Sequence, residues 1–258
     1  MKVERSRFPV KRLSDGRALL NLGSSARVAP GWNNVDFSWL IRLGRHPRLC
    51  AVLHRLGWLS EDRYLRILKL DRDTVLWDLS RGIPFAKETF DAVYHCHLLE
   101  HLDREVAPAF LQECHRVLKP GGILRVVVPD LEKLARGYLG VVDRLPDQAT
   151  LAQHRSAVEK LFEQMVVRIP KIRKEQKLFV QFLEHIFIGS TARSGTMHRW
   201  MYDQFSLGQL VREAGFYDTQ VLNATTSQIA GWHEFHLDTE LDGAPYKAGS
   251  LYLEGRKT

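Results

Sequence analysis

The sequence predicts an α/β fold built on a doubly wound, mostly parallel sheet, and two observations support this. Short apolar runs bounded by turn residues alternate with stretches of helical periodicity over most of the 258 residues. Strands that alternate with helices form parallel sheets, because a crossover helix returns the chain to the same end of the sheet. Apolar residues make up 45% and charged residues 26% of the chain, which indicates a globular protein and excludes a low-complexity one.

Seven strands and the helices between them account for this alternation. The strands are expected at 17–22, 34–37, 74–78, 90–96, 123–128, 219–224 and 249–254. The helix after Asp103 repeats its apolar residues at helical spacing and stops at Pro120 and the two glycines that follow. A further helix begins near Asp130, and another covers 206–216.

Two stretches are too long to be simple strand connections. Residues 38–72 are basic and helical in pattern, and residues 141–200 hold two amphipathic helix patterns, near 151–165 and 178–186. Long connections in a compact domain commonly act as a lid or substrate cap. Helices packed on the flank of the sheet are the alternative. We expect a single domain over 1–258 in which both insertions form a helical cap.

The net charge of +7 is unevenly distributed along the chain. Residues 1–70 carry 14 Lys and Arg against 5 Asp and Glu, whereas residues 201–258 carry 4 against 8. A basic surface attracts nucleic acid, anionic lipid or an anionic substrate such as a sugar phosphate, and a simple solvated face is the alternative. No zinc finger or basic run with interleaved aromatics is present, so we expect an anionic acceptor rather than nucleic acid.

Features of the compartment also follow from the sequence. The first twelve residues carry charge throughout and lack the apolar core of a secretory signal. No stretch approaches the ~20 apolar residues of a membrane span, so any membrane contact would be peripheral. The three cysteines, Cys50, Cys96 and Cys114, are scattered without a CxxC, which suits reduced thiols. We expect a cytoplasmic protein, of an oligomeric state that the sequence leaves open.

Polar groups follow successive strands at the edge where an open parallel sheet binds its ligand. The first strand runs into Leu22–Ser25 (LGSS), where Gly23 permits a tight turn and close backbone approach. Asp36 ends the second strand, and its carboxylate can accept hydrogen bonds from both hydroxyls of a ribose. Asp78 ends the third strand and His97 follows the fourth. Together these groups predict a nucleoside-containing ligand.

These segments resemble the class I S-adenosylmethionine-dependent methyltransferases, and most closely a type 11-like branch often linked to bacterial polysaccharide biosynthesis. The resemblance rests on LNLGSSARVAPGWNNVD, WDLSRGIPFAKETFDAVYHCHLLEHL, LQECHRVLKPGGILRVVVPDLEKL and YDQFSLGQLVREAGF. It covers residues 17–140 and 200–257 and leaves the two insertions out. It implies a transferase with a Rossmann-like, seven-stranded sheet whose last strand is antiparallel. The implied methyl donor is S-adenosyl-L-methionine, and the product is S-adenosyl-L-homocysteine.

The resemblance also implies roles for single residues. The cofactor-binding set comprises Leu22, Gly23 and Ser24 along the methionine part, Asp36 on the ribose, Asp78 on the adenine amino group, Leu79 beside the adenine ring, and His97 facing the methyl group. The loop departs from the family pattern, because Ser24-Ser25 stand where a second glycine is usual and Ser25 cannot adopt a positive φ cheaply. A protein that binds the cofactor weakly, or a non-catalytic binding protein, is therefore an alternative. No GxGxxG follows the first strand, which disfavours NAD.

Histidines near the proposed site are candidates for a general base, which a hydroxyl acceptor would need. His97 is the first candidate, and His198, just before the late helix, is the second. We interpret His95 as a buried histidine with its hydrogen bonds satisfied. We interpret His101, together with Glu100, as the opening of the next helix.

The residue pattern predicts an acceptor wall and disfavours a metal site. The segment HRWMYD predicts a wall of Arg199, Trp200 and Tyr202, with aromatic rings on a sugar and the arginine on an anionic group; a hinge packed on the sheet is the alternative. Asp130 and Glu132 have no second acidic cluster at hard-cation spacing. We therefore expect no metal.

The sequence thus predicts a methyltransferase that O-methylates a hydroxyl of a glycan, a lipid-linked sugar or a similar polar metabolite. One alternative is methylation of a small aromatic natural product, with Trp39, Trp58 and Trp200 as contacts. The other is the non-catalytic binding protein. Modification of nucleic acid is disfavoured, because HCHL stands where an NPPY-like tetrapeptide is usual.

Overall fold

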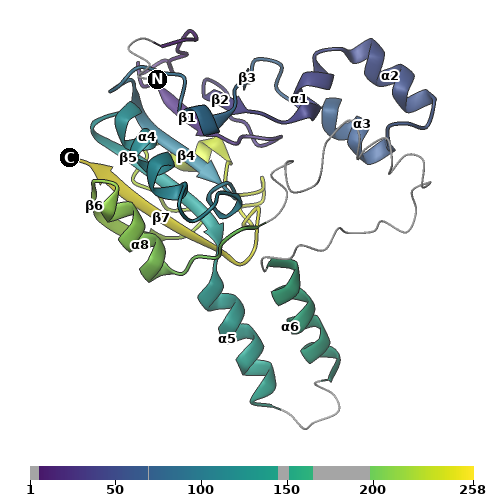
Figure 1. The fold of residues 1–258 in the computed structure, drawn as a ribbon, viewed down its shortest axis with the longest axis vertical. Coiled ribbons are helices and arrows are strands. Elements are labelled where there is room, and N and C mark those ends of the chain that lie inside the picture. The colour runs from purple at the N-terminus through teal and green to yellow at the C-terminus, as the bar shows by residue number, and fades with distance from the viewer. Residues whose placement is uncertain (1–5, 69, 145–150, 165–197) are drawn as a thin grey trace.

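The computed structural model describes residues 6–68, 70–144, 151–164 and 198–258, which form a seven-stranded sheet flanked by helices (Figure 1). The elements in chain order are β1 (Leu19–Leu22), β2 (Asn33–Asp36), α1 (Trp39–Gly44), α2 (Pro47–Arg55), α3 (Glu61–Leu68), β3 (Val75–Leu76), η1 (Leu79–Arg81), β4 (Phe90–Cys96), η2 (Leu99–His101), α4 (Ala107–Val117), β5 (Leu118–Pro129), α5 (Leu131–Val142), α6 (Leu151–Gln164), α8 (Gln204–Glu213), β6 (Phe216–Leu222), α9 (Trp232–Phe235) and β7 (Ser250–Lys257).

The strand order confirms the predicted fold class. The sheet runs β3-β2-β1-β4-β5-β7-β6, with chain direction reversed only at β7, which pairs antiparallel with both β5 and β6. The pairs β1–β2, β1–β4, β2–β3 and β4–β5 are all parallel. The order turns back at β1, where β2 lies on one side and β4 on the other. A ligand site is expected at the carboxyl ends of the strands beside such a switch point.

The strand bounds differ from the sequence prediction in every strand but β4, and two of the differences have a local cause. The third strand covers only Val75–Leu76, because the Asp78 side chain accepts a hydrogen bond from Ser80 N and turns the chain into η1. The fifth strand begins earlier than expected, at Leu118, and includes Pro120. Residues just before a proline disfavour the helical conformation, so α4 ends at Val117 and the chain extends at once.

Both faces of the sheet are covered by buried apolar clusters. On one face, Val93 and Val126 belong to a cluster with Leu111 of α4 and Leu207 of α8. On the other face, Trp32, Tyr94 and Trp232 meet edge to face, with ring centroids 5.2–6.3 Å apart. Both faces of the sheet are therefore covered, and its carboxyl edge is the place where a ligand site is expected.

A buried ion-pair network fixes the long loop before β7 on the sheet. Arg125 of β5 is fully buried and donates to Asp238 Oδ2 at 2.8 Å and to Glu254 Oε1 at 2.7 Å. Tyr94 OH donates to the other oxygen of Asp238 at 2.6 Å. Because these bonds satisfy the buried charges, the loop that carries Lys247 and Ser250 is held against the edge of the sheet.

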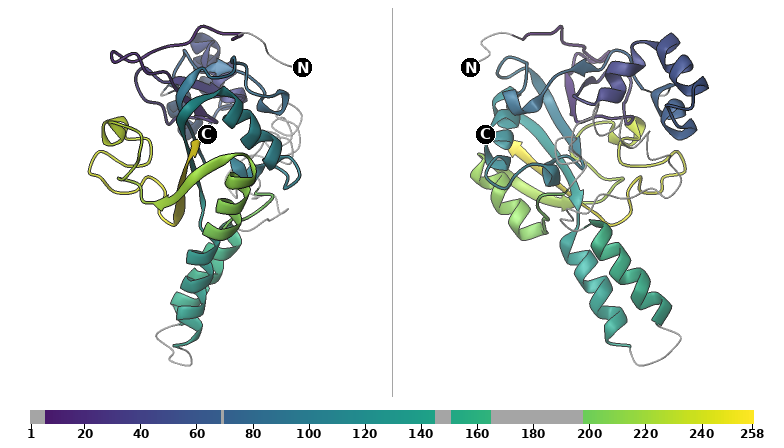
Figure 2. Two further views of the ribbon diagram at one scale, coloured as in Figure 1. Left: turned by 90° about the vertical axis from the view of Figure 1, so that its left-hand side faces the viewer. Right: turned by 45° about the vertical axis from the view of Figure 1, so that its right-hand side comes forward.

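The described parts of the two insertions form separate units. Helices α1–α3 form a lobe beside β2 and β3, with a small core of its own around Cys50, Leu59 and Ile67. Helices α5 and α6 lie side by side and project away from the sheet (Figure 1, Figure 2). Helix α6 confirms the first amphipathic pattern, whereas the pattern near 178–186 lies outside the described residues. No helix in the described ranges has the length and apolarity to span a membrane.

Candidate active site

The turn after β1 is the first component of the site and has a left-handed backbone at two positions. Gly23 has φ +66°, and Ser25 has φ +47°, which is uncommon for a residue with a Cβ. The amides of Gly23 and Ser24 both point at Val35 O, at 2.8 and 3.3 Å. A Cβ on Gly23 would lie 3.1 Å from Leu98 Cδ1, so the close packing of the turn also favours glycine.

Asp36, at the end of β2, holds this turn and the start of α1 together. Its Oδ2 accepts from Ser25 N at 2.8 Å, and its Oδ1 accepts from Ser38 N at 2.6 Å. These bonds hold Ser25 in its strained conformation. Each carboxylate oxygen keeps a further lone pair, so Asp36 can still accept hydrogen bonds from ribose hydroxyls.

The other residues of the predicted cofactor set lie along the same edge. Leu22 is fully buried in the core, and the buried Ser24 Oγ has no hydrogen-bond partner among the described residues. Asp78 is partly exposed and uses Oδ1 to accept from Ser80 N at 3.0 Å, with half-buried Leu79 next to it. A strained turn, a buried carboxylate and an unpartnered hydroxyl fit a nucleoside linked to an amino acid.

His97 is the third residue of the edge with a positive φ, at +51°. Its amide continues the sheet by donating to Val127 O at 2.8 Å, so the strain is held by strand pairing. Its ring lies between two partners, with Nδ1 3.1 Å from Glu100 Oε1 and Nε2 2.9 Å from Ser250 Oγ. A non-glycine residue held in this conformation is a mark of functional positioning.

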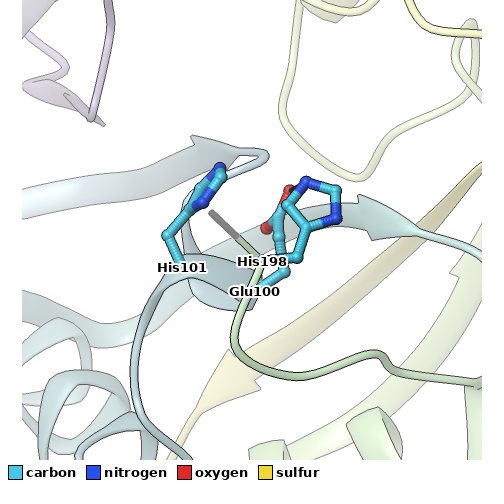
Figure 3. Close-up of side chains that lie close together, drawn as sticks. All are labelled: Glu100, His101 and His198. Atoms are coloured by element: carbon cyan, nitrogen blue, oxygen red, sulfur yellow. Dashed lines mark ion pairs between the residues drawn. The ribbon is translucent and has the colours of Figure 1, made fainter. Parts of the chain in front are cut away.

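Glu100 is fully buried beneath a group of histidines, because η2 turns it inward three residues after His97. Burial alone would raise the pKa of Glu100, but the hydrogen bond from His97 and the nearby rings of His97 and His101 hold it below its usual range. His101 and His198 stack edge to face above it, with ring centroids 4.9 Å apart (Figure 3). The carboxylate is therefore a permanent anion within reach of three imidazoles.

The same cluster contains the strongest metal-ligand arrangement of the described residues. Glu100, His101 and His198 each offer one ligand atom, and these atoms lie within 4.8 Å of one another. Ligands of a bound transition metal lie at about 2.0–2.2 Å from the ion, so the three would have to draw closer to hold one. The sequence prediction had paired His101 and Glu100 only with the start of a helix; they form a 3₁₀ turn instead, and α4 begins at Ala107.

His95 differs from its sequence interpretation in one respect. Its side chain is fully buried, as expected, and burial lowers its pKa from 6.5 to about 4. However, neither ring nitrogen has a hydrogen-bond partner among the described residues, so the interpretation of a satisfied histidine was wrong. The ring packs edge to face on Phe110 at 5.3 Å, which explains why the neutral form is retained.

A pocket of about 940 Å³ opens between the hairpin of α5 and α6 and the carboxyl end of β5. Both candidate bases, His97 and His198, line it. Lys133 of α5, Lys160 of α6 and Lys247 of the loop before β7 also line it, and none of the described lining residues is acidic. No acidic residue in the described ranges forms an ion pair with any of these lysines, so the pocket is electropositive.

The structure does not bring Arg199, Trp200 and Tyr202 together as one wall of this pocket. The Arg199 guanidinium pairs with Asp103, and the Trp200 ring lies under Arg104, 4.7 Å from its guanidinium carbon. Tyr202 is buried in the core, and burial raises its pKa to about 12. The segment 198–202 instead docks on η2, where the amides of Arg199 and Trp200 donate to Glu100 O.

Sequence reasoning missed several groups that the fold brings to the pocket. Glu100 had one available signal, its spacing of three residues from His97, which places both on one side of a helical turn. Ser250 and the three lysines had none, because only the packing of β7, the hairpin and the loop before β7 brings Ser250 against His97 and the lysines into the same pocket. Their positions depend on tertiary structure.

Comparison with known proteins gives one match to a family model, in the first half of the chain. A family model described as "Methyltransferase domain" matches residues 64–126, from α3 into β5, and therefore includes Asp78, His97 and Glu100. The seven-stranded sheet with its antiparallel β7 is the one expected for that family. The matched part of the chain therefore resembles a methyltransferase domain.

Solved structures of methyltransferases are similar to this one at low sequence identity. A SAM-dependent methyltransferase from Archaeoglobus fulgidus is 13% identical, with a TM-score of 0.40 over 93% of this chain and 85% of that one. A SAM-dependent methyltransferase from Thermotoga maritima is 15% identical, with a TM-score of 0.43 over 98% and 84%. A comparison with curated proteins found no match.

Proposed function

We propose that this methyltransferase O-methylates a hydroxyl of an anionic, polar acceptor, such as a glycan or a lipid-linked sugar that carries a phosphate or carboxylate. The observation that carries the proposal is the pocket, which joins two histidines and three lysines and has no acidic residue among its described lining residues. In the same proposal, Leu22, Gly23, Ser24, Asp36, Asp78 and Leu79 hold the cofactor. The hairpin of α5 and α6 acts as the acceptor wall.

His97 is the proposed general base. With Nδ1–H directed at the Glu100 carboxylate, Nε2 carries the lone pair, and an acceptor hydroxyl that replaces Ser250 as its partner can give its proton there. The buried anion of Glu100 stabilises the imidazolium that forms and fixes the ring orientation. His198, whose Nε2 lies 3.9 Å from Glu100 Oε1, is the second candidate for this role.

The balance of the reaction is simple. Bound S-adenosylmethionine supplies a sulfonium methyl group, which is transferred to the acceptor oxygen and leaves S-adenosylhomocysteine. The bond from carbon to the acceptor oxygen forms as the bond to sulfur breaks, and the hydroxyl proton goes to His97. The chain contributes orientation, exclusion of water and the base.

Lysines in the pocket support an anionic acceptor over a neutral aromatic one. Three ammonium groups with no acidic partner in the part of the chain that the structure describes favour phosphate or carboxylate at this position. Tyr138 is the one aromatic side chain besides the two histidines among the described lining residues, and Trp58 lies elsewhere, after α2. The free thiols of Cys50, Cys96 and Cys114 suit a reducing compartment, and we place the reaction in the cytoplasm.

The test is a methyl-transfer assay with the purified protein, labelled S-adenosylmethionine and a panel of sugars and phenols, each with and without a phosphate or carboxylate. We expect transfer to oxygen of the anionic sugars. His97→Asn should lower kcat by about 100-fold or more while S-adenosylmethionine affinity changes little, because asparagine tolerates the positive φ but cannot act as the base. Transfer restricted to neutral phenols would overturn the acceptor class.

Metal dependence is the second arm of the same assay. Because Glu100 is already engaged by His97, we expect full activity in the presence of EDTA. Loss of activity in EDTA with recovery on addition of zinc, manganese or magnesium would instead assign Glu100, His101 and His198 as metal ligands.

A further inference from the structure

The lobe formed by α1–α3 carries an apolar stripe that faces solvent. Leu49, Val52 and Leu56 follow one another at helical spacing along α2, and Trp58 comes just after them. Their exposed fractions are 48%, 52%, 58% and 54%. The other side of α2 is already used, since Cys50 and Leu53 pack in the small core of the lobe. The side chains of the stripe therefore do not contribute to the core of the lobe.

The stripe lies in a stretch of the sequence that contains arginines and lacks acidic residues. From Phe37 to Ser60 the sequence contains no Asp or Glu and has four arginines, at positions 42, 45, 48 and 55. Arg48 and Arg55 are both exposed on α2, beside the stripe. Apolar side chains with an aromatic residue and flanking arginines are the pattern of a helix that lies in the interface of an anionic bilayer.

We propose that the stripe of Leu49, Val52, Leu56 and Trp58 docks this methyltransferase on an anionic membrane surface. The apolar side chains enter the boundary between headgroups and acyl chains, and Arg48 and Arg55 contact lipid phosphates. A second copy of the chain fits the stripe less well, because a two-fold interface would place the same arginines against each other. Nucleic acid would satisfy the arginines but leave the apolar side chains in water.

The position of the lobe connects this surface to the reaction. Ser38 caps α1, and its backbone N–H donates a hydrogen bond to Asp36. The lobe therefore starts two residues after Asp36, the residue proposed to bind the ribose. Docking would hold the carboxyl edge of the sheet near the bilayer, where a lipid-linked acceptor is presented. The link between docking and a lipid-linked acceptor rests on the proposed function, whereas the docking surface itself does not depend on that function.

The experiment is co-flotation of the full chain with vesicles of phosphatidylcholine alone and of an equal mixture with phosphatidylglycerol. We expect binding to the mixture only. The double variant Leu56→Ser/Trp58→Ser should weaken it by about tenfold or more, through loss of buried apolar area. Arg48→Gln/Arg55→Gln should weaken it by about 10- to 30-fold, through loss of attraction to the lipid phosphates.

Matched controls distinguish specific docking from nonspecific hydrophobic adsorption and from unfolding. Phe205→Ser and Leu241→Ser remove exposed apolar side chains outside the lobe and should leave vesicle binding unchanged. Every variant should retain the parent's melting temperature and S-adenosylmethionine affinity. Failure of the parent to bind the mixed vesicles, or equal binding by the Leu56/Trp58 variant, would overturn the proposal.

Two further outcomes would also overturn it in favour of another occupant. Concentration-dependent dimers in sedimentation velocity that disappear in the Leu56/Trp58 variant would assign the stripe to a second copy. Tight binding of duplex DNA that is lost in the arginine variant, without vesicle binding, would assign it to nucleic acid. The two proposals can fail separately. If the chain methylates a soluble anionic sugar but does not bind vesicles, only the docking proposal is wrong. If it binds vesicles but does not O-methylate, only the proposed acceptor class is wrong.

Discussion

The proposed cofactor half and the proposed acceptor half of the sheet's carboxyl edge are built in different ways. The cofactor half, from Gly23 to Asp36, is local in sequence: backbone amides and one carboxylate organise each other within a single crossover. The acceptor half joins His97, His198, the hairpin lysines and Ser250 from four separate segments. A methyl donor that is common to many enzymes needs only the first kind of site, while the acceptor is selected by parts that are added around it.

This comparison predicts that Asp36→Ala damages the cofactor half alone, with the largest effect on binding. The variant removes the carboxylate proposed to accept two charge-assisted hydrogen bonds from the ribose, and it removes the anchor of the strained turn. We expect S-adenosylmethionine affinity, measured by calorimetry, to fall by about 100-fold or more. Asp73→Ala, an exposed carboxylate paired with Lys11 outside the site, is the control and should change nothing. Retained affinity in Asp36→Ala would place the ribose elsewhere.

Glu100→Gln tests the acceptor half by removing the anion behind His97 while keeping the shape of the side chain. We expect kcat to fall by roughly 10- to 100-fold with S-adenosylmethionine affinity unchanged, because the imidazolium loses its stabilising partner. The acid limb of the pH–rate profile should also move to lower pH. A lower kcat with an unmoved profile would indicate that Glu100 is only structural.

His95, adjacent to the site and buried, gives a stability prediction with a defined pH window. Its pKa is 6.5 in the unfolded chain and about 4 in the folded one, so the unfolded state binds the extra proton first as the pH falls. The folded protein should lose about 3 kcal/mol of unfolding free energy between pH 6.5 and pH 4 from this group. Denaturant titrations of His95→Leu should lack this loss. An identical profile in parent and variant would show that His95 is not the cause.

Ser25→Gly is the mildest test, and it concerns the departure of the turn from the family pattern. Glycine relieves the left-handed strain at φ +47° but gains freedom in the unfolded chain, so we expect a small net stabilisation of roughly 0.5 kcal/mol. S-adenosylmethionine affinity should stay within about twofold. A tenfold loss of affinity would instead mean that the Ser25 hydroxyl contacts the cofactor.

The same contrast explains what could be predicted from the sequence. Alternation of strands and helices is a local signal, so the fold class followed from it, and Gly23 and the acidic residue that ends β2 are local signals for a cofactor edge that stays a prediction. Glu100 was misread because a single helical turn and the opening of a longer helix have the same local pattern. Arg199, Trp200 and Tyr202 look like a wall in sequence, but backbone bonds to Glu100 direct the segment onto η2.

The most direct test of the acceptor half compares one acceptor with its counterpart that lacks the anionic group. The measurement is the ratio of their kcat/KM values in the parent and in Lys133→Gln/Lys160→Gln/Lys247→Gln. We expect a ratio above about tenfold in the parent, falling toward unity in the variant while the neutral acceptor is used equally by both. A ratio near unity in the parent, or one that survives loss of the three lysines, would contradict an acceptor site selected by the hairpin and the loop before β7.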